Sequence, residues 1–284
     1  MKLKYSTSNM SSKDLLIKFQ GRILNNVVSL DEHTVEYFNP NATINDTGYY
    51  PCYVMIPFEN AKRFVCSTYI TVGYKPLPVE AFSCISQEYR KLICSWKAPP
   101  NPVKTDYILY DYFYHENVRR LCPEYLNATS CLWAMDTRAP YMRSRPQLTF
   151  MMVGRNSLGT NKQYFNVEHF KIVKPSAPLS ANCSRITPTT VFLEWSSPAN
   201  MEYGEFRPGL MYSIQYRPLS SDSGTFKELW LYFQTAGSVE IGDLIPYTEY
   251  EFKIRSRSNV SESDLMWSPY LTISAKTLPD SNAA

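Results

Sequence analysis

The seven cysteines of this chain are the residues whose chemistry depends most on spacing. Cys84 and Cys94 are ten positions apart, and Cys122 and Cys131 are nine apart. Short spacings with turn residues between them are typical of local disulfide bridges between neighbouring strands. The alternative is a metal site, but the sequence has no Cys-x-x-Cys and its three histidines are scattered, so we expect neither metal nor cofactor. We predict the bridges Cys84–Cys94 and Cys122–Cys131.

Six Asn-x-Ser/Thr sequons point to the compartment in which such bridges form. Asparagine in this context accepts glycans in secreted proteins. Paired cysteines together with repeated sequons favour an oxidising, extracellular location. We expect glycosylation at Asn9, Asn41, Asn45, Asn127, Asn182 and Asn259.

Composition and missing motifs exclude several classes of function. The net charge of +3 is too weak for a phosphate-binding face, so we expect no nucleic-acid partner. The chain lacks Gly-x-Gly-x-x-Gly, His-Glu-x-x-His and Gly-x-Ser-x-Gly motifs, so we expect no enzyme. The chain has no apolar run of about 18 residues, which is the length that a membrane-spanning helix needs. No apolar leader follows Met1 either, and we expect that the natural N-terminus is incomplete.

Strands must position these residues, because apolar and polar residues alternate with period two throughout the chain. Examples are residues 150–153 and 212–216, and the 22 tyrosines suit half-buried strands. Proline-rich stretches at 75–78 and 174–178 disfavour helix and separate runs of strands. The sequence therefore predicts an all-β chain of three β-sandwich domains, residues 1–75, 76–174 and 175–284.

The first predicted domain carries Asp-Thr-Gly-Tyr-Tyr-Pro-Cys at residues 46–52, which resembles the turn before strand F of an immunoglobulin domain. In that family, the tyrosine two residues before the cysteine bonds back across the corner. The cysteine pairs with one upstream, but none precedes Cys52 here. Either the N-terminus is missing or Cys52 has another partner. A hairpin of residues 50–56 and 64–72 about Glu59 would place Cys66 opposite it, so we predict a Cys52–Cys66 bridge.

The other two predicted domains resemble fibronectin type III modules. Trp195 ends an alternating strand, and Leu-Ile-Pro-Tyr-Thr-Glu-Tyr at 244–250 is similar to a fibronectin E–F corner. The four paired cysteines, with Trp96 two residues after Cys94, resemble the cytokine-binding module of type I cytokine receptors. The preceding immunoglobulin-like domain resembles that of the signal-transducer group of interleukin-six receptors, which narrows the family. The degenerate Trp-Ser motif, which the next paragraph describes, suggests an invertebrate member of that group. The fold this implies is an immunoglobulin-like β-sandwich followed by two fibronectin type III β-sandwiches.

A charged strand near the C-terminus extends this resemblance. Lys253, Arg255 and Arg257 alternate along one strand and therefore project from one face. In the family, tryptophans of a Trp-Ser-x-Trp-Ser segment stack between such cations. Trp267 keeps the second tryptophan here, whereas Asp264 and a leucine replace the first Trp-Ser. We expect a shortened ladder of cation–π contacts, each worth roughly 0.5–2 kcal/mol; the alternative is a solvated strand face.

The resemblance implies a receptor for a secreted four-helix-bundle cytokine. The family binds ligand at the elbow between its fibronectin domains, through loops that correspond to residues 135–145, 196–208 and 259–264. The implied protein is the extracellular part of a plasma-membrane receptor that assembles JAK/STAT-type signalling complexes with a second receptor chain or as a homodimer. Aromatic, Met and Arg side chains dominate binding hot spots. The expected ligand contacts are Tyr141, Met142, Arg143, Tyr203 and Phe206.

Two other functions stay open on the sequence. Adhesion or guidance ectodomains also join immunoglobulin and fibronectin modules, although ordinary fibronectin modules lack the double cysteine pair. A secreted decoy would bind the cytokine without signalling. The partner of Cys183 stays open as well.

Overall fold

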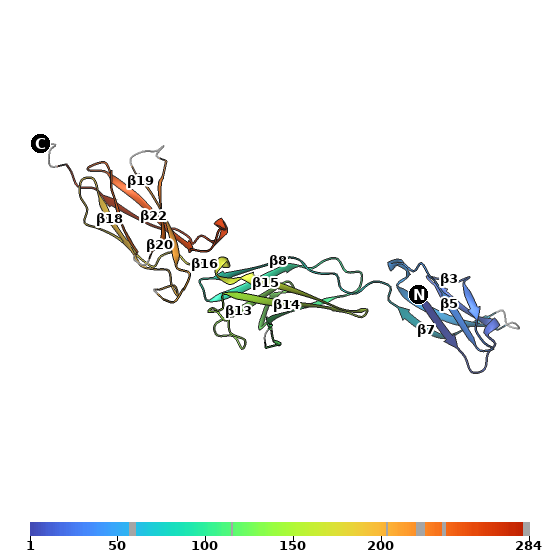
Figure 1. The fold of residues 1–284 in the computed structure, drawn as a ribbon. Helices are drawn as coiled ribbons and strands as arrows, with labels where there is room; N and C mark the ends of the chain where they lie inside the picture. The colour runs from blue at the N-terminus through green and yellow to red at the C-terminus, as the bar shows by residue number, and fades with distance from the viewer. Residues whose placement is uncertain (57–60, 115, 203, 220–224, 235–236, 281–284) are drawn as a thin grey trace. The chain divides into compact units, whose positions relative to one another are not determined.

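The computed structural model describes residues 1–56, 61–114, 116–202, 204–219, 225–234 and 237–280 (Figure 1). These residues form strands and four short 3₁₀ helices, as the period-two alternation predicts. Within the described chain, no helix is both long and apolar enough to cross a bilayer. The helices are η1 (Ser12–Asp14), η2 (Ile44–Asp46), η3 (His169–Ile172) and η4 (Asp264–Met266).

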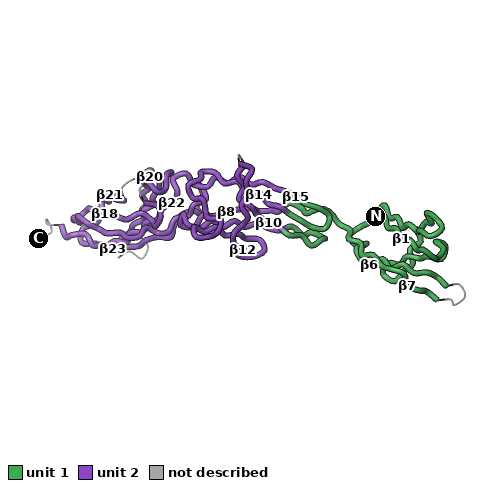
Figure 2. The backbone as a smooth tube through the Cα atoms, turned by 90° about the horizontal axis from the view of Figure 1, so that it is seen from below, with its two compact units in different colours: residues 1–78, 99–106, 154–161 green, residues 79–98, 107–153, 162–284 purple. Residues whose placement is uncertain are grey.

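The chain divides into two compact units, shown in different colours in Figure 2. The first comprises residues 1–78 together with residues 99–106 and 154–161. The second comprises residues 79–98, 107–153 and 162–284, and so holds two sandwiches. Contacts between those two sandwiches are therefore contacts within one unit.

The first sandwich consists of a three-stranded and a four-stranded sheet. The three-stranded sheet has the order β1 (Lys2–Ser6), β5 (Thr34–Phe38), β4 (Val27–Ser29). The four-stranded sheet has the order β3 (Arg22–Ile23), β2 (Leu15–Phe19), β6 (Gly48–Ile56), β7 (Ala61–Ile70).

The predicted corner of the first sandwich is formed by Tyr50. Its hydroxyl donates to the Asp46 carbonyl oxygen at 2.7 Å, and its ring stacks on Phe19 at 4.5 Å between centroids. Burial raises the pKa of Tyr50 to about 12, so the phenol keeps the proton it donates. The Asp-x-Gly-x-Tyr-x-Cys motif therefore makes the corner that it makes in immunoglobulin domains.

The predicted bridge in this sandwich is absent, although its hairpin is present. Cys52 and Cys66 face each other across β6 and β7, yet both are free thiols, so the predicted Cys52–Cys66 disulfide is wrong. The register shifts between Cys52 and Tyr53. The pair therefore lies beside a bulge, where the ladder is locally disrupted and the twist of the strand increases. Glu59, about which the hairpin was expected to turn, lies outside the described residues.

The second sandwich pairs a four-stranded with a five-stranded sheet. The first has the order β11 (Val118–Leu121), β10 (Asp106–Phe113), β14 (Gln147–Asn156), β15 (Gly159–Glu168). The second has the order β12 (Glu124–Asn127), β13 (Ser130–Ala134), β9 (Lys91–Lys97), β8 (Glu80–Gln87), β16 (Val173–Lys174). Trp96, Trp133 and Phe150 fill the core between them.

The third sandwich also has two sheets, and its core contains Trp195, Tyr250 and Phe252. The predicted E–F corner is present, because the Tyr250 hydroxyl accepts a hydrogen bond from the Ile245 backbone N–H at 3.0 Å. One sheet has the order β17 (Ala181–Ser184), β18 (Val191–Trp195), β21 (Ser238–Ile241). The other has the order β20 (Lys227–Gln234), β19 (Leu210–Pro218), β22 (Glu249–Ser258), β23 (Leu271–Lys276).

Candidate ligand-binding surface

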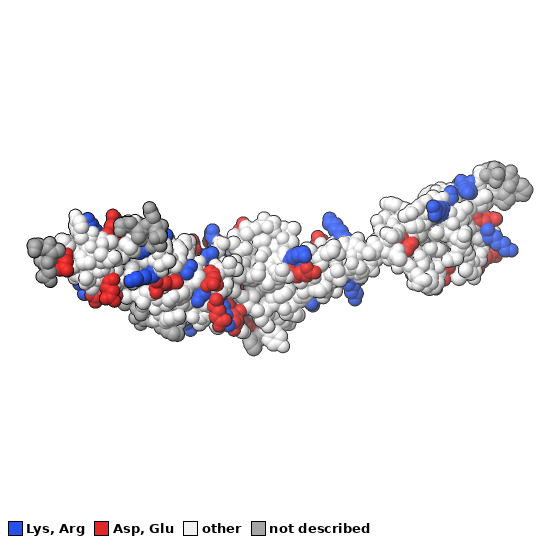
Figure 3. All heavy atoms as spheres, turned by 90° about the horizontal axis from the view of Figure 1, so that it is seen from above, with Lys and Arg blue, Asp and Glu red and all other residues white. Residues whose placement is uncertain are grey.

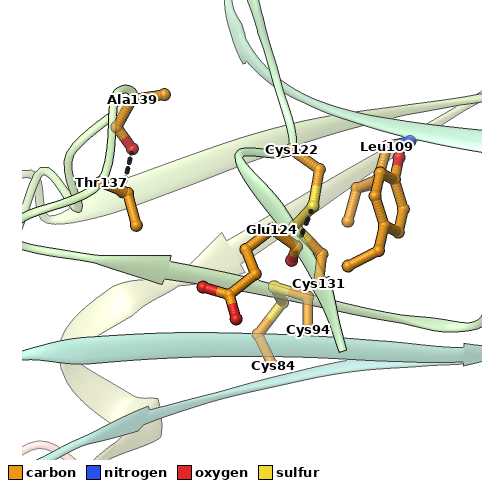
Figure 4. The surroundings of a disulfide bond; sticks show 9 residues. Cys84, Cys94, Leu109, Cys122, Glu124, Cys131, Thr137 and Ala139 are labelled. Carbon is orange, nitrogen blue, oxygen red and sulfur yellow. Dashed lines mark hydrogen bonds between the residues drawn. A yellow bond between two sulfur atoms is a disulfide. The ribbon is translucent and has the colours of Figure 1, made fainter. Parts of the chain in front are cut away.

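Two disulfides lie side by side in the second sandwich (Figure 4). Cys84 faces Cys94 across β8 and β9, and Cys94 faces Cys131 across β9 and β13. The bonds are Cys84–Cys94 and Cys122–Cys131, so both predicted bridges are present. Each closes a loop of about ten residues, for which chain-entropy models give about 2–3 kcal/mol of stabilisation.

We predict that peptide mapping of the non-reduced protein recovers these two bridges and no others. The thiols of Cys52, Cys66 and Cys183 should resist alkylation in the native protein and react after denaturation. Burial raises the pKa of both Cys52 and Cys183 to about 11, so the reactive thiolate is scarce at neutral pH. Recovery of a linked Cys52–Cys66 peptide would contradict this prediction.

The charged strand β22 forms the expected ladder with the segment that follows η4. The Trp267 ring lies between two guanidinium groups, with 4.5 Å from its centroid to Cζ of Arg255 and 4.5 Å to Cζ of Arg257. The Trp267 side chain is buried, and the ring of Tyr270 lies 4.8 Å from the same Arg255 group. The period-two cations therefore act as stacking partners and not only as a solvated strand face.

Asp264 takes the place of the missing tryptophan without stacking. Its Oδ1 atom accepts from Nε1 of Trp267 at 3.3 Å and lies 3.5 Å from Nη1 of Arg257. Lys253, which we expected in the same ladder, lies over a different ring, 4.7 Å from the centroid of Phe226. The ladder thus contains two aromatic rings, Trp267 and Tyr270, and the Asp264 carboxylate at its end forms an ion pair with Arg257.

Tyr141, one of the predicted ligand contacts, is part of the core of the second sandwich. Its side chain is 4% exposed and its hydroxyl lies 2.6 Å from Oγ of Ser86. Burial raises its pKa above the ordinary tyrosine value. The loop carries Tyr141 inward because its backbone N–H donates to the Ala134 carbonyl at 3.0 Å. The expectation of an exposed anchor at Tyr141 is therefore wrong.

Phe206 is likewise buried, at 5% exposure, and its partners come from the second sandwich. Its ring contacts Tyr89 edge-on at 5.1 Å and Phe170 edge-on at 5.6 Å. Phe206 therefore stabilises the contact between the two sandwiches, and the expectation that it is an exposed ligand anchor is wrong. We call the set Tyr89, Arg143, Phe170, Glu205 and Phe206 the junction cluster.

Arg143 completes the junction cluster as an ion pair across the two sandwiches. Its Nη2 atom donates to Oε2 of Glu205 at 3.1 Å, and its guanidinium lies 5.2 Å from the centroid of Tyr89. Met142, the preceding residue, is 39% exposed, so this predicted contact does lie on the surface. Tyr203, the remaining predicted contact, lies outside the described residues.

Tyr89 and Phe170 were missed in the sequence because neither belongs to a motif. Tyr89 occupies a tight turn between β8 and β9, where it and Glu88 both have positive φ values, 56° and 53°. This conformation costs free energy in a non-glycine residue, and it persists where contacts with the surrounding structure fix it. The turn lacks the glycine or asparagine that would have marked it.

The third predicted loop, residues 259–264, runs from β22 to η4. Asn259 donates from its backbone N–H to the Gly209 carbonyl at 3.0 Å, while Val260 is 42% exposed. Leu265, one residue beyond the loop, is 74% exposed. The second unit therefore presents exposed apolar side chains at Met142, Val260 and Leu265.

The charged and metal-ligating side chains of this chain are dispersed over its described surface. Across the described residues, no three His, Cys, Asp or Glu side chains gather in a way that could hold a metal ion. Positive and negative side chains are interspersed on the face shown in Figure 3. Such a surface offers local ion pairs and apolar contacts to a protein partner.

Residues 176–274 match the family model "Fibronectin type III domain". The chain is thus all-β, with an immunoglobulin-like sandwich followed by fibronectin type III sandwiches, as predicted. It is 23% identical over 236 residues to the Drosophila melanogaster "Cytokine receptor", covering 78% of this chain and 18% of that protein. It is 25% identical over 225 residues to the dog "Leukemia inhibitory factor receptor", covering 74% of this chain and 19% of that protein.

A relative of a different kind is human "Usherin", which is 29% identical over 210 residues. The match covers 68% of this chain but only 4% of usherin. This chain therefore spans less than a fifth of the length of each of these three relatives. Over about three quarters of its own length, it is similar to an insect protein named as a cytokine receptor and to a mammalian protein named as a leukemia inhibitory factor receptor.

Proposed function

We propose that this chain is the extracellular, glycosylated part of a membrane-anchored cytokine receptor. Its domains would be residues 1–75, 76–174 and 175–284, and its ligand a secreted four-helix-bundle cytokine. The observation that carries the proposal is the pair of adjacent disulfides in one sandwich, with the cation–π ladder in the next. The similarity to named cytokine receptors supports the same class.

The proposed subfamily is the interleukin-six signal-transducer group, and within it we propose an insect receptor of the Domeless type. Ligand binding would bring a second receptor chain or a second copy together for JAK/STAT-type signalling, without enzymatic activity in the chain itself. A secreted form would act as a decoy. The sequons fit an extracellular location, since Asn9, Asn41, Asn45, Asn127 and Asn182 are exposed and Asn259 is half-buried.

We propose that the ligand contacts the exposed side chains around the junction cluster, with Met142 as the central anchor. Met142 is exposed between two ordered neighbours, Tyr141 in the core and Arg143 in the ion pair. The fixed neighbours hold the backbone at Met142, and its exposed apolar side chain suits the apolar face of a partner helix. Arg143 would contribute indirectly, by keeping the two sandwiches together.

The test begins with capture of secreted proteins from the source organism on the immobilised chain, followed by mass spectrometry. We expect a small helical protein, and we expect Met142→Ala to weaken its binding by more than about tenfold with an unchanged melting temperature. Ile245→Ala is the matched control, because Ile245 is 59% exposed and lies outside the three loops. Normal binding by Met142→Ala would remove this site from the proposal.

The competing function is an adhesion ectodomain, a class that also joins immunoglobulin-like and fibronectin type III modules such as the one matched here. The capture experiment separates the two functions. An adhesion role predicts a large matrix or cell-surface partner, and binding that survives changes around the junction cluster.

A further inference from the structure

Asp111 is a charged residue at a core position of the second sandwich. It follows the buried Leu109 by two residues on β10, so both side chains face inward, and Asp111 is 4% exposed. Two arginines hold its carboxylate: Nη2 of Arg120 lies 2.5 Å from Oδ2, and Nη1 of Arg145 lies 2.9 Å from Oδ1. Since a carboxylate has about four positions for donors, these contacts leave it able to accept more hydrogen bonds.

A small cavity lies beside this carboxylate, between the two sheets of the second sandwich. Its volume is about 10 Å³. One buried water molecule needs about 10–15 Å³ of such space, so the cavity has room for one water and for no larger ligand. The lining residues are Asp111, Arg120, Leu148 and Phe150 from one sheet, Leu92 and Trp133 from the other, and residues 140–142.

Two buried N–H groups of lining residues have no hydrogen-bond partner within the described part of the chain. They are Nε1 of Trp133 and Nε of Arg120. Trp133 is 2% exposed, and its ring packs on Phe150 with 5.3 Å between centroids, so the indole is shielded from bulk solvent. Both groups can only donate, and buried donors of this kind usually have a partner. An acceptor is therefore required at this place.

The groups around the cavity define the chemistry of that acceptor. Two N–H donors repel a cation and are not satisfied by an apolar group. The Asp111 carboxylate repels an anion but accepts a hydrogen bond from a donor. The site therefore suits a neutral group that both accepts and donates, and a water molecule is one small enough for the cavity. A buried water typically makes about three hydrogen bonds, which matches the three polar groups present.

We propose that this cavity is a binding site for one structural water molecule. The water accepts from Nε1 of Trp133 and from Nε of Arg120, and it donates to the carboxylate of Asp111. Because Trp133 lies on β13 whereas Asp111 and Arg120 lie on β10 and β11, the water links the two sheets of the sandwich. The inference needs no receptor ligand, and it stands or falls separately from the proposed function.

The site also borders the loop that carries Met142. Residues 140–142 line the cavity, so the proposed water fills the space between this loop and the charged pair Asp111–Arg120. The loop thus rests on a polar contact as well as on the buried ring of Tyr141.

The test is a crystal structure of the full chain at a resolution that shows ordered water. We expect density for one water in the cavity, about 2.7–3.2 Å from Nε1 of Trp133, from Nε of Arg120 and from an Asp111 oxygen. A cavity without density, or a water that lacks any one of these three contacts, would overturn the proposal.

Two variants test the role of the indole N–H. Trp133→Phe removes one donor and part of the cavity wall, so the water should be lost or displaced. Trp96→Phe is the matched control and should keep the water in place. Trp96 also has a buried indole N–H without a partner among the described residues, but it does not line this cavity. A water that is unchanged in Trp133→Phe would contradict the proposed bridge.

Nuclear magnetic resonance in solution keeps the proposal testable if Trp133→Phe does not fold. In the wild-type chain, the Trp133 indole N–H should show a nuclear Overhauser contact with water, of the sign that marks a long-lived bound molecule. The Trp267 indole is the control and should show none, because its Nε1 already donates to Oδ1 of Asp264 at 3.3 Å. The lack of such a contact at Trp133 would overturn the proposal.

Discussion

Replacing Trp267 with alanine is expected to lower the free energy of unfolding of the third sandwich by about 3–5 kcal/mol, the range for large buried aromatic residues. Trp267 is 5% exposed, and its ring separates the guanidinium groups of Arg255 and Arg257. Without the ring, the two arginines lose their cation–π contacts and face each other as like charges. Asp264 also loses the indole N–H that it accepts.

The measurement is thermal or urea unfolding of the purified chain, monitored by near-ultraviolet circular dichroism. Leu265→Ala is the matched control, because Leu265 is 74% exposed two residues away and its truncation should change stability by no more than about 0.5 kcal/mol. An unchanged unfolding midpoint for Trp267→Ala would mean that the ladder adds nothing to the fold.

Replacing Phe206 with alanine should cost a similar amount, about 3–5 kcal/mol, but its effect should reach both sandwiches of the second unit. Phe206 is 5% exposed and contacts Tyr89 and Phe170. Its loss leaves a cavity between the sandwiches and removes two edge-on aromatic contacts, each worth about 0.5–1.5 kcal/mol beyond the buried area. We therefore expect the unfolding of the two sandwiches to separate into two transitions.

Calorimetry of Phe206→Ala, Tyr89→Ala and the double variant measures this coupling. The cost of the double variant should be smaller than the sum of the two single costs, because each single change already breaks the shared contact. Met142→Ala serves as the control from the same region, since its side chain is 39% exposed. Additive costs, or a single unchanged transition, would show that Phe206 does not couple the sandwiches.

The features that were predicted correctly depend on short-range patterns. The bridges Cys84–Cys94 and Cys122–Cys131 close loops so short that few other geometries are available to them. The Tyr50 corner lies within five residues of chain, and the ladder follows from the two-residue period of a strand. In each case the number of residues between two positions nearly determines the distance between them in the fold.

The features that were missed depend on contacts between distant segments. The residues next to a loop tyrosine such as Tyr141 do not show whether its side chain faces solvent or core. Its burial depends on hydrogen bonds to Ser86 and His169, which are distant in the sequence. Phe206 is buried only because a turn aims Tyr89 at it from another sandwich. For Cys52 and Cys66 the register was predictable, but the bulge beside them was not.

The row of cysteines across β8, β9 and β13 has a consequence for oxidative folding. Cys94 has a cysteine opposite it on each side, Cys84 on one strand and Cys131 on the other. Of the three ways to pair four cysteines, one therefore joins Cys94 to Cys131 within a native-like sheet. An external thiolate that opens the accompanying Cys84–Cys122 bond leaves itself on Cys122 and frees the Cys84 thiolate, which attacks Cys94 across the paired strands and releases the Cys131 thiolate. The Cys131 thiolate then attacks Cys122 and expels the external thiol, which completes both native bridges. The sheet itself then acts as a template along which a mispaired chain can be corrected.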